Sequence, residues 1–294
     1  MEFRVLQYFI AIVTNKSITG AAKELHISQS TLSRQIMDLE DELGVTLFSR
    51  GSRQITLTED GTFLYERARE LTHLMEATTT ALERGATLTG ELTVGAGEGK
   101  ANPWVTQIFR QLIHEGENVT INFRSQDADQ IIRGIDAGIL DFGIISTTTG
   151  LDKYSTLTLP FENYWGLVMP SDHPLAQRSS LVAADLKGQD LLLPQQLDVN
   201  SQLRSYLDEY VVDYAVVGTY DMNYNMRALV ASGVGLALTF DKPEYDTGDY
   251  AFRRLQYLDP IPSILIWRKD RPMTRLAEAF LKRLTALKMA GESS

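Results

Sequence analysis

The sequence predicts a small, mainly helical amino-terminal domain, a long connecting helix and a larger carboxy-terminal domain of two α/β lobes. Two observations lead to this fold class. Three short amphipathic helical segments and a small hairpin occupy residues 1–58, and one long helical repeat follows them. From residue 91 onward, strands and helices alternate in two successive sets.

Length, charge and cysteine content narrow the class of protein. A chain of 294 residues fits about two domains. The net charge of −10 argues against a surface that coats nucleic acid, but basic and acidic side chains balance within residues 1–58, so DNA contact would be local. No apolar stretch reaches membrane-spanning length, the first residues do not resemble an export signal, and there is no cysteine. We therefore expect a cytoplasmic protein without membrane contact.

Three helices are expected before residue 44. Apolar residues form one helical face over residues 3–13. The second segment, residues 17–25, opens with the hydroxyl of Ser17 and carries adjacent alanines that let another helix approach. Ser28 caps the third helix, whose apolar stripe repeats at spacings of four, three and four at Leu32, Ile36, Leu39 and Leu43.

The polar side of the third helix has the chemistry that reads a DNA groove. Ser and Gln can bond base edges, Arg can bond guanine or phosphate, and the helix N-terminus favours a phosphate. The expected DNA-binding residues of this helix are Ser28, Gln29, Ser30, Thr31, Ser33, Arg34 and Met37.

A hairpin after the third helix completes the amino-terminal domain. Ile55 and Leu57 alternate behind a turn that contains Gly51, and Arg50 and Arg53 could grip phosphate or enter the minor groove. Together these elements predict a winged helix-turn-helix DNA-binding domain over residues 1–58. Periodicity alone leaves open that three short amphipathic helices merely pack together.

Residues 59–84 are expected to form a linker helix that pairs with a second copy of the chain. Thr58 is the expected cap, and about 26 residues would extend about 39 Å. An apolar repeat of four and three indicates a heptad seam, and packing of this seam on the downstream domain is the alternative. The expected dimerisation residues are Leu64, Ala68, Leu71, Met75, Thr78 and Leu82.

Two α/β lobes are expected after a hinge at residues 85–90, which contains two glycines. Alternation of strands and helices predicts mostly parallel sheets. Lobe I is assigned to about 91–161 and 267–294, and lobe II to about 162–266, within an effector domain over residues 91–294. Ligands of open parallel sheets bind beyond the carboxyl ends of strands, so a small-molecule cleft is expected between the lobes.

The sequence closely resembles the LysR-type transcriptional regulators. The runs that carry the resemblance in the DNA-binding part are residues 17–25, 26–36, 39–40, 43–44, 47–48 and 57–61, with looser matches at 172–175, 230–235 and 267–272. Family members commonly carry proline where this chain has Ser30. The resemblance implies two periplasmic-binding-protein-like lobes that sense a metabolite, and a homodimer that assembles into a homotetramer.

The resemblance also points to effector-binding residues. Many relatives present a Ser or Thr hydroxyl to a ligand carboxylate in the first loop, where this chain has glycines flanked by Glu98 and Lys100. Lys100 could hold an anion and Glu98 could select an amine, and an ordinary surface-loop role for both is the alternative. The implied residues are Gly97, Glu98, Gly99, Lys100, Gln126, Asp127, Ser146, Gln195, Asn200, Ser201, Met222 and Asn223.

No catalytic, cofactor or metal site is expected. The glycine-rich stretch 95–100 lacks the spacing of a phosphate-binding loop or a dinucleotide site. The stretch around Ser232 lacks the glycine of a nucleophile elbow. The four histidines have no second ligand at metal spacing: His26, His73, His114 and His173.

The expected function is DNA-binding transcriptional regulation controlled by a small-molecule effector between the lobes. Symmetric dimers would place their recognition helices in successive major grooves of a partly palindromic operator in double-stranded DNA. A contact with RNA polymerase is compatible with this role. The alternatives are a solute-binding receptor without DNA binding and, less favoured, an enzyme built on the two-lobed domain.

Overall fold

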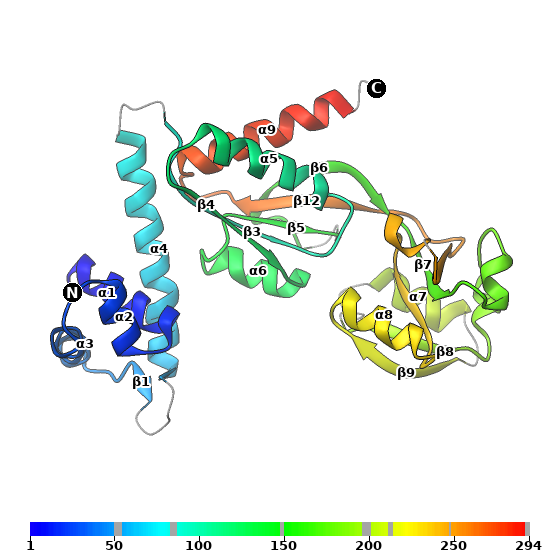
Figure 1. The fold of residues 1–294 in the computed structure, drawn as a ribbon, viewed down its shortest axis with the longest axis horizontal. Coiled ribbons are helices and arrows are strands. Elements are labelled where there is room, and N and C mark those ends of the chain that lie inside the picture. Colours follow the sequence, from blue (N-terminus) through cyan, green and yellow to red (C-terminus); the bar gives the residue numbers. More distant parts are fainter. Residues whose placement is uncertain are drawn as a thin grey trace.

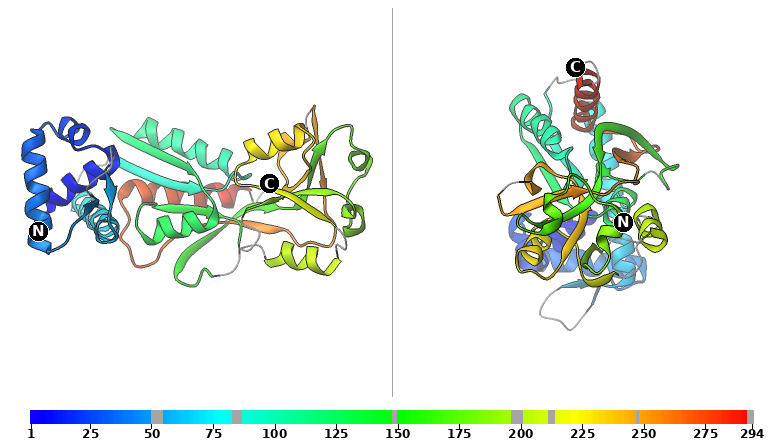
Figure 2. Two further views of the ribbon diagram at one scale, coloured as in Figure 1. Left: turned by 90° about the horizontal axis from the view of Figure 1, so that it is seen from below. Right: turned by 90° about the vertical axis from the view of Figure 1, so that its right-hand side faces the viewer.

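The protein consists of three bodies in a row: an amino-terminal helical domain, a first α/β lobe and a second α/β lobe (Figure 1 and, seen from below, Figure 2). The structure is a computed structural model that describes residues 1–49, 55–82, 87–147, 150–195, 201–210, 214–246 and 248–291. The linker helix α4 (Glu59–Leu82) stands between the amino-terminal domain and the first lobe. The expected fold class is confirmed.

The amino-terminal domain contains the three expected helices: α1 (Phe3–Asn15), α2 (Ile18–Glu24) and α3 (Gln29–Leu43). The predicted caps form, because Ser17 Oγ accepts from the Gly20 amide and Ser28 Oγ accepts from the Thr31 amide. Leu43 departs from the predicted stripe. It is exposed, because Gly44 ends the helix in a left-handed conformation (φ 70°) and the apolar stripe closes at Leu39.

The wing begins as the sequence predicts, with β1 (Phe48–Ser49) pairing antiparallel to β2 (Thr56–Leu57). Glu40 of α3 has a structural role there. Its Oε1 accepts the Leu47 amide at 2.6 Å and the Phe48 amide at 3.3 Å, which anchors the chain that enters the wing. Arg50 and Arg53 lie outside the described residues.

The linker helix belongs partly to the amino-terminal domain, and this corrects the predicted seam. Thr58 caps it as expected, accepting the Gly61 amide at 2.9 Å. However, Ala68 is fully buried in the chain's own amino-terminal core and Leu64 packs against that core, because α4 lies along α1. Ala68 is therefore not available to a second copy, whereas Leu64 is half-buried. Leu71, Leu74 and Met75 remain exposed.

Lobe I is a five-stranded sheet in the order β4-β3-β5-β12-β6 with helices on both faces. Helices α5 and α9 pack on one face, where Phe109, Phe142 and Phe280 meet, and α6 covers the other face. The bounds are β3 Gly90–Ala96, α5 Asn102–Glu115, β4 Val119–Ser125, α6 Ala128–Asp136, β5 Phe142–Ile145, β6 Tyr154–Asn163, β12 Ile261–Arg268 and α9 Arg275–Gly291.

Lobe II repeats this plan with the strand order β11-β7-β10-β8-β9. One face packs around Leu203, Tyr206 and Leu207 of α7, and the other packs around Met226 and Val230 of α8. The bounds are β7 Trp165–Pro170, β8 Asp190–Pro194, α7 Ser201–Tyr210, β9 Ala215–Tyr220, α8 Asn223–Ala231, β10 Leu236–Phe240 and β11 Tyr250–Arg254, with short 3-10 turns at Pro174–Gln177, Ala183–Leu186 and Pro243–Tyr245.

Both sheets are mixed, not mostly parallel as predicted. In lobe I, β3 pairs parallel with β4 and β5, whereas β12 pairs antiparallel with β5 and β6. Lobe II has the same division, with β7 antiparallel to β10 and β11. The sequence reading missed β6 and β11 because both are edge strands. Their burial alternates or is partial, and β6 contains Pro160, which an edge strand tolerates.

Two predicted boundaries need correction. The limit between lobes at 266 and 267 cuts through β12, which pairs with β5 and β6 along its length and so belongs to lobe I. Gly90, assigned to the hinge, is the first residue of β3 and pairs with Val119. The Leu88 carbonyl accepts the Glu117 amide at 2.8 Å, so residues 88–90 are already fixed to lobe I.

The start of α4 allows no side chain at Gly61. A Cβ there would lie 2.1 Å from the Leu47 carbonyl oxygen, a backbone atom. We predict that Gly61→Ala lowers the free energy of unfolding by about 1–3 kcal/mol, the usual cost of overpacking, as measured by urea denaturation. Gly20→Ala is the matched control, because its Cβ meets nothing closer than 3.4 Å. The control should be neutral or stabilising, and equal effects of both substitutions would contradict this packing.

Candidate DNA-binding face and inter-lobe cleft

Helix α3 presents a polar face to solvent. Its apolar residues Leu32, Ile36 and Leu39 are buried against α1 and α2, which fixes the opposite side outward. Of the predicted DNA-binding residues on this helix, Ser33 is half-buried and the others are exposed: Ser28, Gln29, Ser30, Thr31, Arg34 and Met37.

The first turn of α3 concentrates hydrogen-bonding groups. Ser28 Oγ lies 2.9 Å from Ser30 Oγ and 2.7 Å from Thr31 Oγ1, so three hydroxyls cluster where the helix begins. The free amides of this turn and the helix dipole favour a phosphate there. This arrangement can hold a DNA backbone while Gln29 and Arg34 reach toward base edges.

A cleft of about 180 Å³ lies between the lobes, lined by residues of both. Its walls are the loops that follow the carboxyl ends of β3, β4, β5, β8, β9 and β10, as the rule for open α/β sheets requires. The structure brings nine of the residues implied by the resemblance into this lining: Gly97, Glu98, Gly99, Gln126, Asp127, Ser146, Gln195, Met222 and Asn223.

Three implied effector residues are not placed in the lining. Lys100 is not among the lining residues, and its Nζ donates to Glu162 O at 2.6 Å and to Asp241 Oδ2, at the cavity wall, at 2.5 Å. Asn200 and the side chain of Ser201 lie outside what the structure describes.

Several cleft residues escaped the sequence analysis. Asn163 is buried at the point where the chain crosses between lobes, and its Nδ2 lies within 3.1 Å of Ser146 Oγ, Ile261 O and Ser263 Oγ. Trp165 stacks near Phe240, with ring centroids 4.0 Å apart. Asp241 and Lys242 follow β10 directly, so the strand-end rule could have found them. Asn163 and Trp165 become recognisable only once the crossover strands are known.

The cleft contains buried polar atoms without a partner among the described residues. These are Trp165 Nε1, a donor, and Gln126 Oε1 and Asn102 Oδ1, which are acceptors. Unpaired buried polar groups are costly, so such atoms indicate where a ligand or water would bond. A small ligand that carries both acceptors and donors matches this lining.

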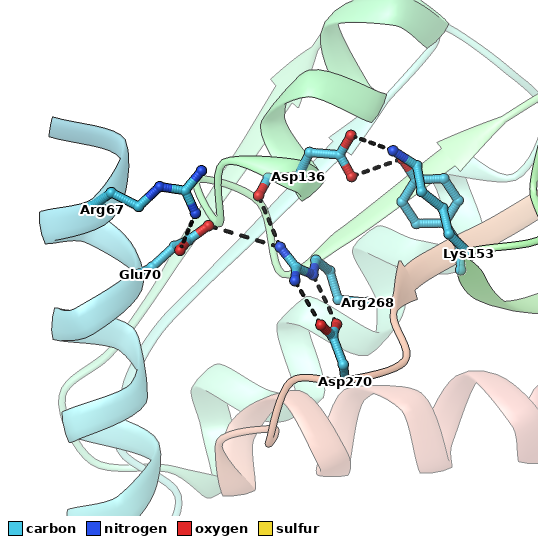
Figure 3. Close-up of polar contacts among 7 residues, drawn as sticks. Arg67, Glu70, Asp136, Lys153, Arg268 and Asp270 are labelled. Carbon is cyan, nitrogen blue, oxygen red and sulfur yellow. Dashed lines mark hydrogen bonds and ion pairs between the residues drawn. The ribbon is translucent and has the colours of Figure 1, made fainter. Parts of the chain in front are cut away.

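An ionic joint connects the linker helix to lobe I (Figure 3). Glu70 of α4 pairs with Arg67 at 2.7 Å and lies 3.8 Å from Arg268 at the end of β12. Arg268 also forms two bonds with Asp270, at 2.9 and 2.8 Å, and donates to the Asp136 carbonyl. The two bonds to Asp270 hold the guanidinium in place, and Glu70 and Arg268 form a charged contact between α4 and lobe I beside the contact of α4 with α9.

A buried carboxyl lies next to this joint. Asp141 Oδ2 accepts the Thr93 amide at 2.7 Å, and the charges of Arg271, Arg69 and Glu91 act on it. Burial raises the pKa of Asp141 to about 6, although the Thr93 bond and Arg271 oppose the shift. The folded protein therefore binds this proton more tightly than the unfolded chain.

The raised pKa predicts a stability that falls as pH rises. Between about pH 4 and 6 the folded state retains a proton that the unfolded state loses, so the free energy of unfolding should fall by on the order of 3 kcal/mol. Asp141→Asn should remove this fall and leave the variant more stable at pH 7, in urea denaturation measured across this range. Asp129→Asn on the exposed first turn of α6 is the control. An unchanged profile in Asp141→Asn would refute the assignment.

The described residues contain neither a membrane-spanning helix nor a cluster of metal ligands. No helix among them is long and apolar enough to cross a membrane. Within the same part of the chain, no group of three or more histidine and acidic side chains is arranged to hold a metal ion.

Comparison with known proteins identifies the family. A model described as "Bacterial regulatory helix-turn-helix protein, lysR family" matches residues 3–62, and one described as "LysR substrate binding domain" matches residues 85–288. A hydrogen peroxide-inducible genes activator from Pectobacterium carotovorum subsp. carotovorum is 31% identical over 240 residues, which cover 81% of this chain and 79% of that protein. The transcriptional activator protein LysR from Escherichia coli (strain K12) is 25% identical over 293 residues, covering 97% and 93%.

The fold is also shared with solved regulators. A full-length OxyR variant from Pseudomonas aeruginosa has a TM-score of 0.70 and 23% identity, and the match covers 97% of this chain and 94% of that one. The chain belongs to the LysR family and is a DNA-binding transcriptional regulator with an effector-binding domain. The alternative of a solute receptor without DNA binding finds no support in these matches.

Proposed function

We propose that this regulator binds a partly palindromic operator as a dimer, through α3 and the wing of each protomer. We further propose that a small effector in the inter-lobe cleft alters how the dimer binds this DNA. The observation that carries the proposal is the exposed polar face of α3 above a buried apolar stripe. A helix of this kind can enter a major groove, whose edges distinguish all four base pairs.

The DNA contact is local. The chain carries a net charge of −10, so its surface taken as a whole does not attract DNA. Arg34, on the exposed face of α3, and Arg50 and Arg53 in the wing segment are the cations that the proposal assigns to the duplex. The hydroxyls at the start of α3 are proposed to contact phosphates and so to fix the position of the helix along the duplex.

Arg34→Ala tests this assignment. We expect it to weaken binding to the DNA upstream of the chain's own gene by about 1–3 kcal/mol, which is about fivefold to 150-fold, and to reduce the salt slope by about one. The measurement is a mobility-shift titration at several salt concentrations. Arg110→Ala, an exposed arginine on α5 of lobe I, is the control and should leave affinity unchanged. If Arg34→Ala behaves like the control, α3 does not read the operator.

The dimer is proposed to form through the exposed part of α4. Leu71, Leu74 and Met75 are 44, 44 and 51% exposed, and Thr78 extends the same face. Such an apolar strip on a helix that projects beyond its own domain favours pairing with a second copy. The family resemblance extends this proposal to a tetramer of two dimers, and RNA polymerase is proposed as a further partner at the promoter.

Leu71→Lys combined with Leu74→Lys should break the dimer. Each buried leucine contributes about 2 kcal/mol, and a symmetric dimer loses each contribution twice, so the dissociation constant should rise by at least about a thousandfold. Sedimentation equilibrium measures it. Met289→Lys, on the exposed side of α9 at 65% exposure, is the control and should leave the mass unchanged. A double variant that sediments as the wild type would exclude this seam.

The effector is proposed to be a small metabolite held without covalent chemistry. The Pectobacterium relative is named for hydrogen peroxide. Reversible oxidation by peroxide proceeds through cysteine thiolates, and the 294 residues contain no cysteine, so that chemistry is not carried over. The relatives are regulators, and we accordingly propose no catalytic activity, no cofactor and a cytoplasmic location for this chain.

A further inference from the structure

A carboxylate of lobe I already occupies an anion site on lobe II. Glu98 lies in the loop between β3 and α5, and its Oε2 accepts the backbone amide of Asn223 at 3.0 Å and also the Asn223 side-chain amide. Asn223 is the first residue of α8, a helix of nine residues. The free amides and dipole at that end of a helix favour a negative charge.

A buried cation marks the same site. The Lys242 side chain is only 8% exposed, and its Nζ lies 3.9 Å from Glu98 Oε2. Burial lowers the pKa of Lys242, and the nearby charges of Glu98 and Glu244 oppose that shift. A buried ammonium requires an anion close by. Glu98 supplies one, but at a distance that leaves room for a closer carboxylate.

A second pair of opposite charges connects the two lobes at the same place. Lys100, two residues after Glu98, bonds Asp241, the neighbour of Lys242. Glu98 is 32% exposed at the edge of the cleft, so solvent and solutes can reach it. Trp165, 3% exposed, lines the same cavity, and its Nε1 has no partner among the described residues, which is an independent sign that an acceptor such as a carboxylate oxygen belongs there. The unpartnered acceptors Gln126 Oε1 and Asn102 Oδ1 of the cleft call for donor groups elsewhere on the same ligand.

We propose that the start of α8 together with Lys242 is a carboxylate-binding site, that the chain fills it with its own Glu98, and that the effector is a small organic acid whose carboxylate replaces Glu98. This inference rests on the proposed role of the cleft as the effector site. Replacement releases Glu98 from Asn223 and removes its ion pair with Lys242, leaving the Lys100–Asp241 pair between the lobes.

Chemical rescue tests the site directly. In the full chain, Glu98→Ala empties the anion position, and its melting temperature should fall by a few degrees. Acetate, titrated at constant ionic strength against sodium chloride, should then raise the melting temperature of Glu98→Ala in a saturable way, because a ligand that binds only the folded state stabilises it. The wild type should respond less, since Glu98 competes with acetate.

Two variants make the result specific. Glu117→Ala, which removes an exposed carboxylate of lobe I, should show no acetate response. Adding Lys242→Met to Glu98→Ala should abolish the rescue. The proposal is overturned if acetate acts equally on the wild type and Glu98→Ala, if it acts on neither, or if rescue persists without Lys242.

A distance measurement covers the case in which Glu98→Ala does not fold. Glu98→Gln keeps the side-chain size and removes the charge. Spin labels at Gln111→Cys in lobe I and Lys187→Cys in lobe II, both exposed, are unique because the sequence has no other cysteine. Glu98→Gln should broaden the distribution of distances between the two labels. An unchanged distribution would contradict a role of Glu98 in holding the lobes together. Acetate rescue and label distance are measured without DNA, so this inference and the proposed DNA binding can fail independently.

Discussion

The packing of α4 into the amino-terminal core is the constraint on which the rest of the structure depends. Ala68 is fully buried there, and Gly61 lets the helix touch the Leu47 carbonyl. Because the first half of the helix packs on α1 and β2, its exposed half is held in a fixed direction relative to the recognition face. Any pairing through Leu71 and Leu74 therefore also sets the separation of the two recognition helices.

The same helix contacts the effector domain at α9 and at the end of strand β12. β12 has Ser263 in the cleft lining near one end and Arg268 beside Glu70 at the other, a span of roughly 17 Å at about 3.4 Å per residue. The strand is tied into the sheet on both sides by β5 and β6. A ligand that changes how the lobes meet at Asn163 would therefore act on a rigid element that ends at α4.

Local signals explain what the sequence could predict. Caps at Ser17, Ser28 and Thr58 and regular apolar spacing placed the helices of the amino-terminal domain. The strand-end rule predicted a cleft between the lobes, and the family resemblance pointed to nine of the residues that line it. Such local signals do not show which residues contact each other when they lie far apart in the sequence. The heptad repeat could not show that Ala68 belongs to the chain's own core, and no local pattern could reveal that Glu98 and Lys100 bond residues more than a hundred positions away.

The most direct test of this account is the distance between the two recognition helices in the DNA-bound protein. Asp41→Cys, on the exposed end of α3, gives a single labelling site in a chain without cysteine. Pulsed electron resonance should show one distance between protomers, close to a helical turn of DNA, about 34 Å, or a multiple of it, after allowance for the label. The absence of any distance between protomers would contradict it.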